Sequence, residues 1–162
     1  MKKIILILMM LFIIGCGGGS GNPVIPPAPD FSGLEGTWTG EITIAGNIDY
    51  TAARGNPAHT VYESHTAPIE WIITKDSING VGIVKVKGGA FTYDGSILTF
   101  KWENSSVSWD KTSSIHNVGE WSMPLYRTST SGVITGTLKE TWEKDQYGSS
   151  YGVLAISGEI WR

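Results

Sequence analysis

The fold is decided by the stretch Gly36-Thr37-Trp38-Thr39-Gly40-Glu41-Ile42-Thr43-Ile44, in which apolar or small residues alternate with polar ones. Successive side chains of a β-strand point to opposite faces, so this alternation is typical of a strand with one buried face. Trp38, Ile42 and Ile44 would then pack on a core. The threonines and Glu41 would face water.

The same alternation returns along the rest of the chain and predicts about eight strands. The further buried faces are predicted at Ile69, Trp71 and Ile73; Gly82, Val84 and Val86; Phe91 and Tyr93; Leu98, Phe100 and Trp102; Trp121, Met123 and Leu125; Ile134, Gly136, Leu138, Glu140 and Trp142; and Leu154, Ile156, Gly158 and Ile160. No stretch shows the periodicity of a helix, so the fold class is all-β.

Short turn-like runs separate the predicted strands, at residues 77–80, 87–89, 93–96 and 147–150. Sequential hairpins that each bury one face favour a single antiparallel up-and-down β-barrel, because closure removes the exposed sheet edges. The alternative is a two-sheet β-sandwich, which uses the same alternation.

Two segments lack apolar alternation, residues 46–67 and 103–117. We expect them to be long connections that cover one mouth of the barrel or pack beside it. Long connections in compact β domains are often functional. Mobile surface loops or irregular extra strands are the alternative.

The N-terminus has the pattern of a secretory signal: Lys2 and Lys3, an apolar run over residues 4–14, and then Gly15-Cys16. This run is too short to span a bilayer as a stable helix, which takes about 20 apolar residues. Its end, Ile13-Ile14-Gly15-Cys16, resembles the lipobox of bacterial lipoproteins. An ordinary secreted protein with a stray cysteine is the alternative.

The lipoprotein resemblance implies that residues 1–15 are removed and that Cys16 carries the acyl chains that anchor the protein in a membrane. More than one acyl chain gives stable anchoring. Gly17 stands where relatives retained at the inner membrane carry aspartate, which favours the outer membrane of the cell envelope. Residues 16–33, rich in Gly and Pro, would form a tether, and residues 34–162 the β domain.

Charge and cysteine content exclude several classes of function. Without residues 1–15 the chain keeps 10 basic and 15 acidic residues, a formal charge of −5 with no basic run. Nucleic-acid binding needs clustered Lys and Arg, so we expect no nucleic-acid partner. Cys16 is the only cysteine, which excludes an intramolecular disulfide and a Cys-rich zinc site.

The opening Gly36-Thr37-Trp38 resembles the Gly-x-Trp first strand of lipocalins and related barrels. In that family a basic residue near the last strand packs over the tryptophan, a role that the resemblance assigns to Arg162. The chain departs from the family in three ways: it has no Thr-Asp-Tyr motif, no helix after the last predicted strand and no disulfide pair. The resemblance implies a lipocalin-like barrel.

The predicted inner face carries five tryptophans and one carboxylate, and these are the candidate ligand-binding residues: Trp38, Trp71, Trp102, Trp121, Trp142 and Glu140. Tryptophans on an inner face would line a pocket for a small apolar or aromatic ligand. They would equally fill the core, because an eight-stranded barrel is just wide enough for side chains.

Metal and catalytic sites are not expected. His59, Glu63 and His65 would share a face of an extended segment, but the two histidines would lie about 20 Å apart, too far for one ion. No nucleophile elbow, phosphate loop or HExxH motif is present. We therefore expect no enzyme and no cofactor. The hypothesis is a ligand-binding envelope lipoprotein; the alternative is a structural or protein-interaction module with a solid core and an envelope protein as partner.

The anchor makes a direct prediction. Cys16→Ser removes the only thiol, so the chain should no longer incorporate labelled palmitate and its precursor should stay uncleaved. Ser20→Ala, in the tether, is the control and should be labelled normally. Palmitate incorporation by the Cys16→Ser variant would show that Cys16 is not the lipidation site.

Overall fold

The computed structural model describes residues 28–52, 57–82, 86–107, 113–144 and 148–162. They form eight strands: β1 (Gly36–Tyr50), β2 (His59–Ile73), β3 (Ile78–Val81), β4 (Ala90–Tyr93), β5 (Ile97–Val107), β6 (Ser113–Pro124), β7 (Ser131–Lys144) and β8 (Gly148–Trp161). Within these ranges no helix is long and apolar enough to cross a membrane.

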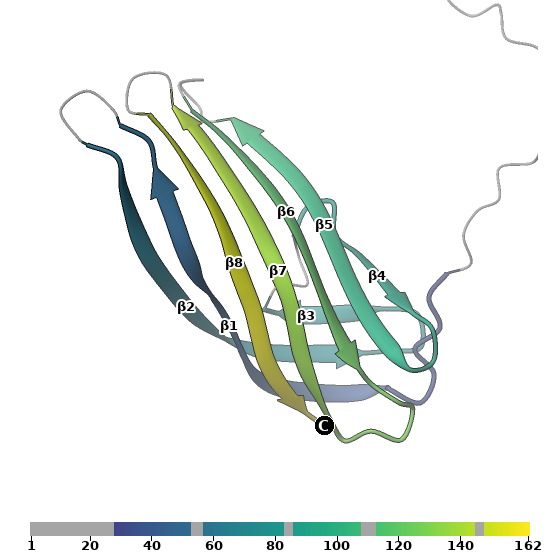
Figure 1. The fold of residues 1–162 in the computed structure, drawn as a ribbon. Coiled ribbons are helices and arrows are strands. Elements are labelled where there is room, and N and C mark those ends of the chain that lie inside the picture. Colours follow the sequence, from purple (N-terminus) through teal and green to yellow (C-terminus); the bar gives the residue numbers. More distant parts are fainter. Residues whose placement is uncertain (1–27, 53–56, 83–85, 108–112, 145–147) are drawn as a thin grey trace, which may run out of the picture.

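All eight strands belong to one antiparallel sheet with the order β3-β2-β1-β8-β7-β6-β5-β4. Except for β3 and β4, strands adjacent in the chain pair with each other, and β1 also pairs with β8, as in an up-and-down barrel. The sheet is interrupted between β3 and β4, its two edges, so it curls into a half-barrel (Figure 1). The predicted all-β, eight-stranded, up-and-down fold is confirmed. The opening of the barrel between β3 and β4 was not predicted from the sequence.

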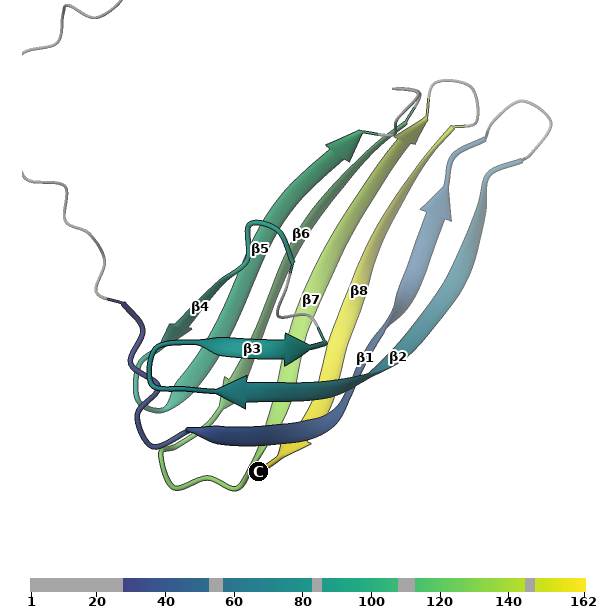
Figure 2. The same ribbon diagram turned by 180° about the vertical axis from the view of Figure 1, so that it is seen from behind.

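The two edge strands are short, and this divides the molecule into two parts. β3 pairs only with residues 70–73 of β2, and β4 only with residues 98–101 of β5. Around them the sheet curls so that β3 and the adjoining parts of β1 and β2 face β5 to β8 (Figure 2); we call this part the barrel end. The six longer strands continue beyond it as one curved layer. This open half comprises residues 46–50, 59–63, 102–106, 115–119, 138–142 and 150–154.

The core lies in the barrel end, where large side chains from both walls meet. Trp71 of β2 stacks on Trp121 of β6 with ring centroids 5.3 Å apart and an interplanar angle of 14°. Phe91 and Phe100 extend this aromatic cluster, with centroids 4.5 Å apart. Offset stacking and tilted contacts of this kind add to the free energy gained by burying the rings.

The seam between β3 and β4 is filled by the residues that precede β1. Phe31 is only 1% exposed, and its N–H donates to the carbonyl of Lys75, which follows β2. On the other side its ring meets Phe91 of β4 edge-to-face, with centroids 6.4 Å apart. Residues 30–33, which the sequence assigned to the tether, therefore join the packed domain.

Two arginines hold this segment against the barrel end. The guanidinium of Arg162 lies 5.3 Å from the ring centroid of Trp38 and donates to the carbonyl of Gly33 at 3.0 Å. Arg127 donates to the carbonyl of Ser32 and pairs with Asp30 at 3.5 Å. The predicted packing of Arg162 over Trp38 is thus present.

The expectation of long loops at residues 46–67 and 103–117 was wrong. β1 continues to Tyr50 and β2 begins at His59, and β5 and β6 extend from either side into residues 103–117. These residues lie in or next to the open half, where no second layer covers the sheet. Because neither face needs to be apolar there, the strands leave no strict hydrophobic alternation.

The turns were predicted with mixed success. Those at 87–89 and 93–96 are present, the second closed by Asp94, whose carboxylate accepts from the N–H groups of Ser96 and Ile97. The turn placed at 77–80 lies earlier, where the N–H of Thr74 donates to the carbonyl of Ser77 at 2.8 Å. Residues 148–150, assigned to a turn, belong to β8. Gly82 lies in a bend, and residues 83–85 and 145–147 lie outside the described residues.

Phe31→Ala tests whether the segment before β1 is part of the core. Truncating a buried phenylalanine should lower the free energy of unfolding by about 3–5 kcal/mol. Tyr126→Ala, at an exposed residue, is the control and should change it by about 0.5 kcal/mol or less. Urea denaturation measures both. Equal, small effects would mean that Phe31 does not support the fold.

Candidate functional site

Three of the candidate tryptophans belong to the packed core. Trp38, Trp71 and Trp121 have no exposed surface. The indole N–H of Trp38 donates to the carbonyl of Leu34 at 2.8 Å, and that of Trp71 to the carbonyl of Gly82 at 3.0 Å. The indole N–H of Trp121 has no partner among the described residues. These rings pack against protein on their faces, as the filled-core alternative predicts.

Trp102 lies where the barrel end meets the open half. Its ring covers Gly119 of the neighbouring strand, where an added Cβ would lie 1.9 Å from the indole. It also contacts Phe100, with ring centroids 5.4 Å apart. Trp102 is therefore buried as well, and glycine at 119 makes room for it.

Trp142 and Glu140, the other two candidates, lie apart from the core. Both are on β7 in the open half, on the face that continues the inner face of the barrel end. We call this face of the open half the concave face. Both residues are half-buried there. The structure thus brings four of the six candidates together in the hydrophobic core and places two on an open surface.

The pairing of four strands sets a row of side chains across this surface. His59 of β2 pairs with Tyr50 of β1, Tyr50 with Ser150 of β8, and Ser150 with Trp142 of β7. The rings of His59 and Tyr50 stack, with centroids 5.0 Å apart and an angle of 8°. Two strand spacings separate Tyr50 from Trp142, about 10 Å. Ser150, between them, is only 4% exposed.

Two carboxylates lie on the same face, Glu63 and Glu140. Glu140 pairs with Asn117 of β6, whose amide nitrogen, turned toward it, donates to Oε2 at 3.3 Å. Glu63 lies 3.4 Å from the ring nitrogen Nε2 of His65, two residues along β2. On β7 the same phase continues from Glu140 and Trp142 to Lys144, which pairs with Gly148 of β8.

The charge of this face acts on Tyr50. Burial raises the pKa of Tyr50 above its ordinary value of 10.0, and the negative charges of Glu63 and Glu140 raise it further. Both effects disfavour the phenolate anion. Two carboxylates from different strands therefore act on one phenol of the concave face.

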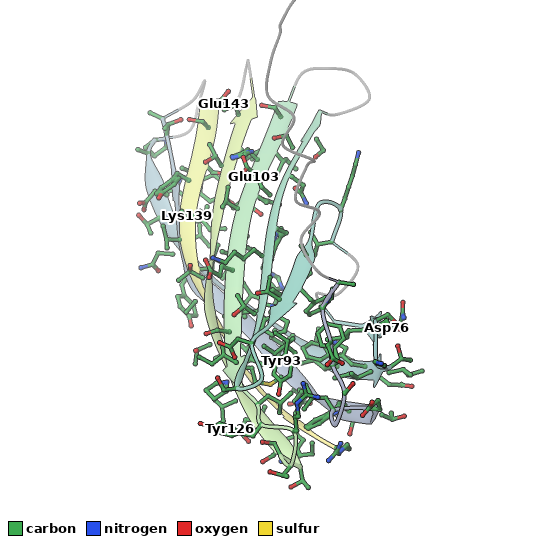
Figure 3. All side chains as sticks on the ribbon, turned by 90° about the vertical axis from the view of Figure 1, so that its right-hand side faces the viewer. Asp76, Tyr93, Glu103, Tyr126, Lys139 and Glu143 are labelled. Carbon is green, nitrogen blue, oxygen red and sulfur yellow. The ribbon has the colours of Figure 1, made fainter. Side chains whose placement is uncertain are left out.

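The outer face of the open half differs in charge. A depression of about 460 Å³ over β5 to β7 is lined by residues that include Lys101, Glu103, Glu120 and Lys139. Lys101 pairs with Glu120 at 2.9 Å. Figure 3 shows Glu103 and Lys139 on the open half, beyond Tyr93 and Tyr126 of the barrel end. Charges of both signs balance here, so this depression has no preference for a charged ligand.

Sequence reasoning missed Tyr50 and Ser150 and considered His59 and Glu63 only as metal ligands. In the structure His59 stacks on Tyr50, while Glu63 lies two residues along the strand beside His65. Among the described residues no group of three or more His, Cys, Asp or Glu is placed to hold a metal ion. The available signal was the phase of β1, since Tyr50 is an even number of residues from Trp38.

Comparison with known proteins found no matching family model, no matching curated protein and no matching solved structure.

Replacing both carboxylates tests the electrostatics of the concave face. In the Glu63→Gln/Glu140→Gln variant the pKa of Tyr50 should fall but stay above 10.0, because burial is the larger cause. The folded protein holds this proton more tightly than the unfolded chain, so the associated stability is lost as the pH rises through and above 10. Ultraviolet titration against Tyr50→Phe measures the pKa. Glu103→Gln, on the outer face, should leave it unchanged; an unchanged pKa in the double variant would contradict the assignment.

Proposed function

We propose that this chain is a lipid-anchored binding module of the cell envelope that holds its ligand on the concave face of the open half. The observation that carries the proposal is the row of His59, Tyr50 and Trp142 on that face. Glu140, two residues from Trp142, and Glu63, four residues from His59, lie on the same face. Aromatic rings that are half exposed offer large contact areas to a ligand at a small cost in side-chain entropy. Nearby polar groups would orient it.

The packing of the barrel end supports an open site over an internal one. Trp38, Trp71 and Trp121 are in contact with protein and have no exposed surface. A ligand beside them would have to displace core side chains, each of which contributes several kcal/mol to stability. Trp142 and Glu140 need no such rearrangement, because they are already partly exposed.

The position of the tether suits this function. Residues 28–35 lie at the barrel end, and the row containing Tyr50 lies toward the opposite end of the long strands (Figure 1). A chain anchored through Cys16 would therefore hold its barrel end toward the membrane. The concave face would be presented away from the membrane, to molecules in the envelope.

A second candidate function is protein interaction through the outer face of the open half. Tyr62 is 67% exposed, and Tyr151 and Val153 are about half exposed. Asn47 and Asp49 of β1 lie between Tyr62 and the other two in the sheet. Exposed aromatic and apolar groups gathered on one face are typical of a docking surface. In this function the concave face would have no ligand.

A thermal-shift screen on the full chain in detergent separates the two faces. The panel contains fatty acids, haem-like and aromatic compounds, primary amines and neutral oligosaccharides. At least one class should raise the melting temperature, since a ligand at a hundredfold excess over Kd stabilises a fold by about 2.7 kcal/mol. Tyr50→Ala/Trp142→Ala should abolish the shift, whereas Tyr62→Ala/Tyr151→Ala should preserve it.

Two outcomes would overturn the proposal. One is an unchanged melting temperature across the whole panel, which would favour the interaction module. The other is a shift that survives Tyr50→Ala/Trp142→Ala, which would place the ligand elsewhere.

A further inference from the structure

Two exposed aromatic residues lie next to the arginines that hold the segment before β1. Tyr126, between β6 and β7, is 61% exposed, and Trp161, the last residue of β8, is 49% exposed. Each is followed in the chain by one of these arginines. Arg127 donates to a backbone carbonyl of residues 30–33, and so does Arg162. The two aromatic side chains therefore belong to the end of the fold at which the chain enters it.

The strand pairing brings both aromatic residues to one surface. Trp161 pairs with Ser131, the first residue of β7. The turn just before β7 is closed by the carbonyl of Tyr126, which accepts from the N–H of Ser129 at 2.8 Å. Val133, about half exposed, lines a shallow depression of about 400 Å³ together with Trp161. We call the surface formed by Tyr126, Val133 and Trp161 the apolar rim.

The length of chain before the fold limits the distance between this end of the protein and a lipid anchor at Cys16. Residues 17–27 separate Cys16 from Ala28, the first described residue. Whatever their conformation, they span at most about 40 Å. The fourteen residues of β8 alone span about 45 Å. The anchor therefore keeps the apolar rim, and not the far end of the long strands, close to the bilayer.

We propose that the apolar rim rests on the lipid bilayer and thereby fixes the orientation of the anchored protein. The inference rests on the lipid anchor of the proposed function and adds a second contact with the membrane. Trp and Tyr gather at the headgroup level of bilayers, because their rings are apolar and carry one polar group that stays in water. Figure 3 shows Tyr126 and Glu143 at opposite ends of the molecule, so a chain held at Cys16 and at the rim directs its open half into the envelope.

The charges around the apolar rim set the depth and the lipid preference of this contact. The guanidinium of Arg127 is paired with Asp30 at 3.5 Å, which reduces its attraction to anionic lipid. Glu159, two residues from Trp161, lies opposite Glu41 of β1, and both are exposed. Carboxylates are costly to bury in hydrocarbon, so the contact ends short of this pair. The contact is therefore shallow, suits zwitterionic lipid and depends little on salt.

Quenching of tryptophan fluorescence by brominated lipid tests this contact. The acylated full chain is reconstituted in phosphatidylcholine vesicles whose acyl chains carry bromine near the headgroups, because bromine quenches tryptophan only at short range. Part of the fluorescence should be lost relative to unbrominated vesicles, and raising the salt concentration should not restore it. Trp161→Phe should abolish this loss. Trp142→Phe, in the open half, is the matched control and should preserve it.

A second pair of variants tests the surface by adding a tryptophan. Tyr126→Trp places one on the apolar rim and should increase the quenched part of the fluorescence. Val153→Trp places one at another exposed position, eight residues before Trp161 on β8 and so about 26 Å away, and its added fluorescence should not be quenched. Both variants keep Trp161, so this comparison stands even if Trp161→Phe disturbs the fold.

Three results would overturn the inference. In the first, the protein sediments with the vesicles but bromine quenches nothing; a dimer that Trp161→Phe dissociates would then assign the rim to a second copy of the chain. In the second, Trp161→Phe and Trp142→Phe show the same loss. In the third, high salt abolishes the loss, which indicates attraction between charges.

Each of these results would leave the proposed function intact, because the thermal-shift panel measures ligand binding on the concave face independently. A chain that does not sediment with vesicles would instead remove the anchor, on which both proposals rest.

Discussion

The structure depends on the contact between Trp71 and Trp121, which joins two walls that are not connected by backbone hydrogen bonds across the seam. β3 and β4 are both edges, so the barrel end is closed by side chains and by the segment around Phe31. Burying an aromatic side chain removes about 150–250 Å² from water, which at about 25 cal/mol/Å² corresponds to roughly 4–6 kcal/mol for each ring. The missing ladder hydrogen bonds would contribute only about 1 kcal/mol each, so ring burial is sufficient to close the barrel end.

The open half follows from the different lengths of the strands. β3 and β4 have four residues each, whereas β1 and β2 have fifteen. Beyond the edge strands no second layer covers the sheet, and its order relies on the long ladders from β2 through β8 to β5. Ile48 and Leu154 nevertheless remain buried in this layer. This arrangement produces an exposed concave surface on a rigid support, which suits a binding site more than a closed core does.

The strands and their inner face could be predicted from the sequence only where a strand has one buried face. In the barrel end the alternation around Trp38 predicted the strands and the inner face, and the resemblance to lipocalins predicted the contact of Arg162 with Trp38. In the open half the alternation fades, and residues 46–67 were mistaken for a loop. The row of His59, Tyr50, Ser150 and Trp142 could not be predicted, because it depends on the register between strands about 100 residues apart in the chain. Alternation identifies a face of one strand but not its neighbours on the next.

Glu63 and Glu140 do not support a ligand site on the concave face equally, because Glu63 has a second explanation. Glu63 lies on β2, which has a free edge in the open half, and an inward charge on an edge strand protects a sheet from pairing with another chain. Pro68, further along β2, contributes to the same protection. Glu140 lies on β7, between β6 and β8, where there is no edge to protect. A charged side chain in the middle of a partly apolar surface cannot prevent pairing at a sheet edge. Binding of a ligand is therefore the better explanation for a carboxylate at Glu140.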